Sequence, residues 1–164
     1  MSNLLILGDA TLLKVAIEIA LNSYPLENVA VLTEDCPKTQ ILGVKVLGSY
    51  ACAASLRTKY ENAAAALPNG ALRLHWLNRL QTLGYTLPPL IHPQSIISPH
   101  ADIEEGSFVH LGVMINAGTQ IGRGCMLCAG SILAQDCTLR DGVNICCGAH
   151  IASGCMLSYR SRIG

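Results

Sequence analysis

Two hydrophobic periods divide the sequence near residue 88. Before that point, short apolar runs alternate with stretches of helical period, which is the pattern of a small parallel sheet with right-handed helical crossovers. The elements are expected in the order strand, helix, strand, helix, strand, helix, at residues 4–7, 11–22, 29–32, 50–59, 63–67 and 70–83. Pro88 and Pro89 end this pattern, so we expect an α/β domain over residues 1–88.

Beyond Pro89 the hydrophobic period changes to six. The residues at this spacing are all aliphatic: Ile91, Ile97, Ile103, Val109, Ile115, Ile121, Leu127, Leu133, Leu139, Ile145, Ile151, Leu157 and Ile163. Four places after each of the first twelve stands a smaller side chain, often preceded by glycine. An α-helix cannot keep this period on one face, whereas a triangular coil with three six-residue sides points one large and one small residue inward per side. We therefore expect a left-handed parallel β-helix of hexapeptide repeats over residues 89–164, with about four coils stacked roughly 4.8 Å apart.

Composition narrows the classes of partner. The formal net charge is +0 and charged residues make up 13% of the chain, without a Lys/Arg-rich run, which argues against nucleic acid or a membrane surface. No apolar stretch approaches the roughly 20 residues of a membrane span, and no basic leader opens the chain, so a cytoplasmic protein is expected. The eight cysteines are then interpreted as reduced thiols, and Cys125, Cys137 and Cys155 as small buried residues of the repeat.

Two features of the repeat leave alternatives open. It runs to Gly164 without a polar cap, so either a partner covers the last coil or the chain is cut short. A column of residues eighteen apart, which comprises His92, His110, Cys128 and Cys146, carries the side chains of zinc sites. A ladder at strand spacing does not converge tetrahedrally on one ion, so packing at the surface or in a trimer is favoured over a metal site.

Five segments carry a family resemblance. They read LILG at 5–8, ILGVKVLG at 41–48, LIHPQSIISP at 90–99, GVMINAGTQIG at 112–122 and GSILAQDC at 130–137. Over its whole length the chain resembles the sialic acid O-acetyltransferase and UDP-amino-sugar N-acetyltransferase family. In that family a small Rossmann-like domain precedes a hexapeptide-repeat β-helix. The resemblance implies a trimer that binds acetyl-CoA between neighbouring β-helices and holds a nucleotide-linked sugar in the N-terminal domain.

Four departures from the family pattern concern its active site. The segment resembling Glu-His-Asp-Cys, whose His is the family's general base, has Gln135 in that place, and an amide cannot accept a proton near neutral pH. A second family His, near acetyl-CoA, is Asn144 here. The glycine-rich turn after the first strand keeps only Gly8, which brings the backbone less close to a phosphate. The family's further coils and its C-terminal segment are absent after Gly164.

Six residues are nevertheless assigned to sites by the resemblance. They are Gln135 and Asp136 as catalytic residues, Asn144 as an acetyl-CoA contact, and Gly8, Asp9 and Asn116 as substrate contacts. Each assignment of a polar side chain competes with a structural role. For Gln135 a solvent-facing or interface polar role is favoured, and for Asp9 the cap of the first helix is favoured, whereas Asp136 is as well explained as a corner residue where glycine usually stands.

Two functions therefore stay open. The first is an acetyl-CoA-dependent acetyltransferase acting on an amino- or hydroxyl-bearing nucleotide-linked sugar, with His110 or His150 of a neighbouring chain as substitute base. The second is a non-catalytic trimeric relative that serves as a scaffold or regulatory partner. Under both hypotheses we expect a homotrimer, because apolar or small residues point outward from the prism. They are Met114, Met126, Ala134, Ala152 and Met156.

Overall fold

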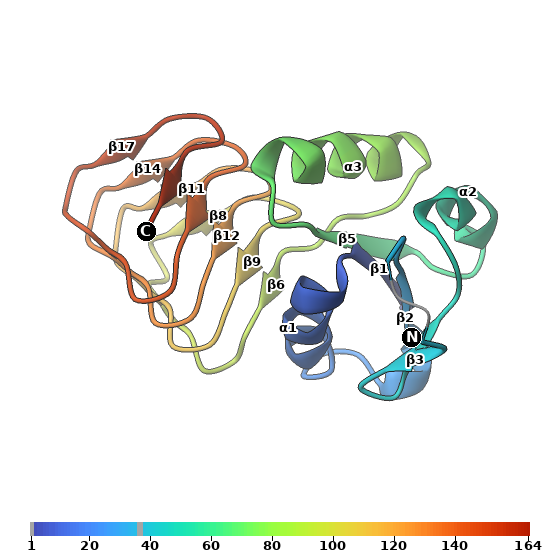
Figure 1. Cartoon of the computed structure of the whole chain (residues 1–164). Helices are drawn as coiled ribbons and strands as arrows, with labels where there is room; N and C mark the ends of the chain where they lie inside the picture. The colour runs from blue at the N-terminus through green and yellow to red at the C-terminus, as the bar shows by residue number, and fades with distance from the viewer. Residues whose placement is uncertain (1, 36–37) are drawn as a thin grey trace. The chain divides into compact units, whose positions relative to one another are not determined.

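A computed structural model describes residues 2–35 and 38–164 of the chain. Two compact units, Met1–Pro88 and Pro89–Gly164, follow one another along it (Figure 1). No helix within the described residues is long and apolar enough to cross a membrane. The cysteines in this part of the chain are free thiols, and Cys36 lies outside the described residues.

The first unit is built on one sheet with the strand order β3-β4-β2-β1-β5. Its strands are β1 (Leu4–Gly8), β2 (Val29–Leu32), β3 (Gln40–Ile41), β4 (Val44–Val46) and β5 (Asn62–Ala66). The helices are α1 (Ala10–Ala20), α2 (Ala53–Leu56) and α3 (Gly70–Thr82), with single 3₁₀ turns at Leu26–Asn28 and Tyr50–Cys52. All neighbouring strands are parallel except the β3–β4 pair.

The central position of β1 explains its unbroken apolar sequence. It pairs with β2 on one side and β5 on the other, and all five of its residues are buried. Strands covered on both faces lose the polar alternation of half-exposed ones. At its end, a Cβ on Gly8 would lie 2.7 Å from the Ala66 carbonyl oxygen of β5, so the close pairing of the two strands requires glycine there.

Two elements of this unit differ from the sequence prediction. The β3–β4 hairpin was missed, although Leu42 and Gly43, with φ of 48° and 80°, form the two-residue turn that joins it. The helix expected over residues 50–59 is reduced to the 3₁₀ turn and the four residues of α2. Only Tyr50 and Ala53 of these two elements are buried, so little packing stabilises a longer helix.

The second unit is the expected left-handed parallel β-helix. Its two-residue strands form three faces. The β6 face holds β6 (Leu90–Ile91), β9 (Phe108–Val109), β12 (Met126–Leu127), β15 (Asn144–Ile145) and β18 (Arg162–Ile163). The β7 face holds β7 (Ile96–Ile97), β10 (Met114–Ile115), β13 (Ile132–Leu133) and β16 (His150–Ile151). The β8 face holds β8 (Asp102–Ile103), β11 (Gln120–Ile121), β14 (Thr138–Leu139) and β17 (Met156–Leu157).

The strand register confirms the period. Ile121 pairs with Ile103 on one side and Leu139 on the other, so residues eighteen apart stack on successive coils. The inward aliphatic residues of the middle coils form one buried core. Toward the two ends of the prism the inward residues are only partly buried, and Ile91 is 37% exposed.

The small inward residues do more than fill space. Ser107, Thr119, Cys125 and Cys137 each donate a side-chain hydrogen bond to the carbonyl oxygen fifteen residues further on, at 2.9, 3.0, 3.2 and 3.2 Å. These carbonyls lie at the corners of the prism, where the strand ladder is interrupted. Treating the inward cysteines as purely apolar residues was therefore incomplete, because their thiols also help to satisfy buried backbone acceptors.

Candidate active site

Three of the assigned residues lie on one corner of the prism. This β7/β8 corner joins the β7 face to the β8 face and consists of residues 98–100, 116–118, 134–136 and 152–154. The Asn116 side-chain amide donates to the Leu133 carbonyl oxygen at 2.8 Å and so ties the second coil to the third. Gln135 is exposed on the adjacent coil. The structure thus brings Asn116, Gln135 and Asp136 together, with Asn116 also in a structural role.

Asp136 has the backbone conformation that the corner demands. Its φ is 60°, in the left-handed region that glycines adopt at equivalent corners. Its carboxylate lies over Gly118, where any side chain would collide with it. The structural alternative for Asp136 therefore has direct support, while the exposed carboxylate stays accessible for chemistry.

His100 is a corner residue that the sequence interpretation overlooked. It belongs to the column His100, Gly118 and Asp136, and its carbonyl oxygen accepts a hydrogen bond from the Gly118 amide at 3.0 Å. Its side chain is exposed and stands two coils, or roughly 10 Å, from Asp136 along the prism. The eighteen-residue stacking rule was sufficient to place it there.

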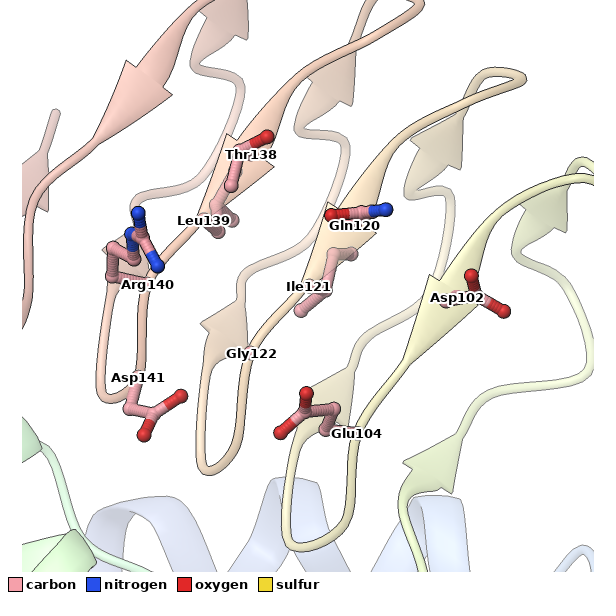
Figure 2. A pocket seen from close by; sticks show the side chains of 9 residues that line it. All are labelled: Asp102, Glu104, Gln120, Ile121, Gly122, Thr138, Leu139, Arg140 and Asp141. Atoms are coloured by element: carbon pink, nitrogen blue, oxygen red, sulfur yellow. The ribbon is translucent and has the colours of Figure 1, made fainter.

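A cavity of about 380 Å³ lies on the β8 face and reaches the corner that follows this face (Figure 2). Asp102, Gln120 and Thr138 project from successive strands into it. Charged residues stand on its opposite edge: Glu104, Arg140 and Asp141. The sequence interpretation missed this cavity, although the polar residue before the inward aliphatic on β8, β11 and β14 distinguishes this face from the others.

The edge of the cavity is held by hydrogen bonds between coils. The Asp141 carboxylate accepts from the Arg123 amide at 3.0 Å, and the Arg123 guanidinium contacts Glu105 at 2.7 Å. A Cβ on Gly122 would lie 2.6 Å from the Asp141 carboxylate, so the corner after the β8 face requires glycine at this position. Fixed side chains of this kind make a preformed wall for a ligand.

Asn144 lies elsewhere on the prism. It follows Gln135 by nine residues, which is half of an eighteen-residue coil, and it stands on β15 of the β6 face. One chain therefore does not bring Asn144 next to Gln135. His110 follows β9 at another corner, with its ring 6.4 Å from that of His92, and His150 is exposed on the β7 face.

No group of three or more His, Cys, Asp or Glu side chains within residues 2–35 and 38–164 is arranged to hold a metal ion. The column of His92, His110, Cys128 and Cys146 thus forms no such group. Its four residues stack on successive coils at the spacing of the strands, so they form a row along the prism and do not converge on one point.

In the first unit, Asp9 is the cap of α1. Its carboxylate accepts from the Leu12 amide at 2.8 Å, as the structural alternative expected. Gly8 is fixed by its packing against β5. Beside them, a cavity of about 650 Å³ opens at the carboxyl ends of the parallel strands and is lined by the lysines Lys14 and Lys38 and by Asp35. The sequence interpretation named neither lysine, since isolated lysines carry no motif.

Acidic groups gather near the same edge of the sheet. Burial, followed by the charges of Glu34, Asp35 and Asp9, raises the pKa of Tyr50 to about 12. The Tyr50 ring packs edge-on against Trp76 with their centroids 5.1 Å apart. The Tyr50 amide donates to the Glu34 carboxylate at 2.9 Å, which fixes the segment after β4 beside the end of β2.

Comparison with known proteins identifies the architecture. The sequence matches no protein-family model and no curated protein. The structure resembles the acetyltransferase domain of PglB from Neisseria gonorrhoeae in complex with acetyl coenzyme A, with a TM-score of 0.91 and 28% identity over 99% of this chain and 80% of that chain.

Two further structures share the fold at lower identity. A variant of GDP-perosamine N-acetyltransferase from Caulobacter crescentus, in complex with CoA and GDP-perosamine, has a TM-score of 0.73 and 22% identity over 99% of this chain and 91% of that one. WeeI from Acinetobacter baumannii has a TM-score of 0.79 and 19% identity over 92% of this chain and 72% of that one. The chain therefore has the fold of these sugar acetyltransferases, which match the family that its sequence resembles.

Proposed function

We propose that this protein transfers the acetyl group of acetyl-CoA to an amino- or hydroxyl-bearing sugar carried on a nucleotide. The observation that carries the proposal is the likeness of nearly the whole chain to the PglB acetyltransferase domain in complex with acetyl coenzyme A. The chain also has the two parts that the sequence predicts for this family, a Rossmann-like sheet followed by a left-handed β-helix. A cytoplasmic location, as expected from the sequence, completes the proposal.

The nucleotide part of the substrate is assigned to the cavity at the carboxyl ends of β1 and β2. Lys14 and Lys38 supply cationic groups, and the cavity includes Ala10 and Thr11 of the first turn of α1. Helix N-termini and lysines both favour phosphate. Asp35, on the same wall, is placed to accept hydrogen bonds from hydroxyl groups. Gly8 and Asp9 support this cavity by shaping the turn rather than by lining it.

The reacting end of the substrate is assigned to the β7/β8 corner. Transfer forms a bond from the acceptor nitrogen or oxygen to the acetyl carbon, breaks the thioester bond and releases CoA as its thiol. The acceptor must lose a proton in this step, and the departing CoA sulfur finally takes one up. Gln135 hydrogen-bonds the acceptor but cannot take this proton. Asp136 and His100 are the titratable side chains of the described corner, and Asp136, beside Gln135, is the proposed proton acceptor. Asn144 is assigned to acetyl-CoA.

Assembly as a homotrimer is part of the same proposal. The outward residues of the β7 face are apolar on three successive strands, and Ile96 and Met114 are 64% and 38% exposed. An apolar column of this kind favours packing against another copy of the chain. Met126, expected to join this outward surface, is only 8% exposed within one chain and does not contribute. Light scattering that finds a stable monomer at micromolar concentration would contradict the trimer.

A non-catalytic scaffold is the alternative that Gln135 favours, because the corner lacks the family's base. Calorimetric titration with acetyl-CoA separates the two functions. Micromolar binding that Asn144→Ala weakens at least tenfold supports the acetyltransferase. Gln94→Ala, which is exposed on the first coil and lines neither of the two described cavities, serves as the control. Absence of binding by the folded protein would favour the scaffold.

A further inference from the structure

A cavity of about 370 Å³ in the first unit plays no part in the proposed acetyl transfer. It lies against β2 and β4 and against the segment that leads into β5. The β3–β4 hairpin contributes residues 40–42 to the cavity assigned to the nucleotide, and Gly43, Lys45 and Leu47 to this one. The two cavities share no lining residue, so they are separate sites.

The strand register explains how Lys45 comes to line this cavity. Ala30 of β2 pairs with Lys45 of β4, so the two side chains point to the same face of the sheet. On this face Ala30 packs in one core with the buried leucines of α3. Because Ala30 has only a methyl side chain, it leaves room for the cavity beside the longer Lys45 side chain.

Lys59 and Tyr60 form another wall, just after α2 ends at Leu56. The amides of both residues donate to the Leu56 carbonyl oxygen at 3.0 Å, and the Asn3 side chain donates to the Lys59 carbonyl oxygen at 2.8 Å. The Lys59 ammonium group lies 5.7 Å from the centroid of the Tyr60 ring. Since these contacts fix the backbone, this wall is formed before a ligand binds.

The lysines and the tyrosine have polar groups left to bind a ligand. Within residues 2–35 and 38–164, neither Lys45 nor Lys59 forms an ion pair, although Glu27 also lines the cavity. Tyr60 is only 4% exposed, yet its hydroxyl group makes no hydrogen bond with a described residue. Burial raises the pKa of Tyr60, so the hydroxyl group is protonated at neutral pH and can donate. Two ammonium groups and a hydroxyl donor favour an anion.

Apolar side chains complete the lining and indicate the rest of the ligand. Leu26 and Leu47 are both exposed at the cavity, so an apolar group that covers them is stabilised by their burial. We propose that this cavity binds a small organic anion, in which a ring or short apolar body carries one carboxylate or phosphate group. Lys45 and Lys59 bind the anionic group, and the Tyr60 hydroxyl donates to it. The proposal does not depend on acetyl transfer.

The test measures the binding of three small aromatic probes to the full chain by saturation-transfer NMR. The probes are phenyl phosphate, benzoate and the uncharged benzyl alcohol. We expect one or both anions to bind with a Kd of about 1 mM or tighter, and the alcohol to bind roughly tenfold more weakly or not at all. The stronger of the two anions shows whether the site takes a phosphate or a carboxylate.

Variants locate the binding. Lys45→Gln and Lys59→Gln should each weaken binding of the stronger anion by about fivefold or more, and Tyr60→Phe by about fivefold, because each removes a donor to the anion. Glu27→Gln removes a like charge, so binding should stay level or tighten. Lys14→Gln is the matched control in the cavity assigned to the nucleotide and should bind as the wild type does.

Four results would overturn the proposal. Neither anion binds, the alcohol binds as tightly as the anions, Glu27→Gln weakens binding, or Lys14→Gln weakens it while Lys45→Gln and Lys59→Gln do not. Circular dichroism establishes that each variant is folded, which is expected because both lysines are exposed.

Discussion

Ile121→Ala tests the inward register of the β-helix. Ile121 is 1% exposed and is flanked by Ile103 and Leu139 on the neighbouring coils. The substitution removes three buried carbon groups, worth about 2.4 kcal/mol at ~0.8 kcal/mol each, and leaves a cavity that adds to the loss. We expect the free energy of unfolding to fall by about 3 kcal/mol, and the melting temperature by about 6–12 °C.

The matched control is Gln120→Ala, one residue away. Gln120 is exposed on the outer side of the β8 face, so its truncation should cost no more than about 0.5 kcal/mol. Equilibrium urea unfolding followed by circular dichroism, at equal protein concentration, measures both variants. If Gln120→Ala were the more damaging change, the six-residue assignment would be displaced by one position and the architecture would be wrong.

Three further variants separate structural from functional roles. Asp9→Ala removes the α1 cap and should cost about 0.5–2 kcal/mol in a thermal melt, and an unchanged melt would remove the capping role. Asp136→Gly puts glycine at a left-handed backbone position, where it is not strained, so the free energy of unfolding should stay level or rise by up to about 1 kcal/mol. Acetyl transfer should fall, and unaltered transfer would end the assignment of Asp136 as proton acceptor. Because the pKa of Tyr50 is raised to about 12 in the folded state, its contribution to stability is complete below pH 10 and is lost between pH 10 and 12. Tyr50→Phe should reduce this alkaline loss in pH-dependent melts, and an identical profile would refute the assignment.

The fold of the second unit was predictable because its rule is local and repeated. Each coil places an aliphatic and a smaller residue inward at fixed spacing, and the strand register follows from that spacing. The hairpin at residues 40–46 was harder, since its strands are short and only the Leu42–Gly43 turn marks it. Burial of Met126 could not be inferred from the repeat, which predicts only whether a side chain points inward or outward.

The candidate site was predictable residue by residue but not as a constellation. The repeat placed Gln135 and Asp136 on a corner, and the eighteen-residue stack would have placed His100 on the same one. It also separates Asn144 from them by half a coil, so one chain does not bring all of the assigned residues together. The cavities beside Lys14 and on the β8 face arise from packing between elements, which no motif records.

The central claim is tested most directly by acetyl transfer itself. The protein is incubated with acetyl-CoA and a panel of nucleotide-linked amino and hydroxy sugars, and the sugar products are detected by mass spectrometry, which avoids interference from the protein's own thiols. The account predicts a monoacetylated sugar nucleotide, and a rate that Gln135→His raises by up to 10²–10⁴-fold where general base catalysis is restored. No acetylated product from either protein, despite measured binding of acetyl-CoA and sugar nucleotide, would contradict it.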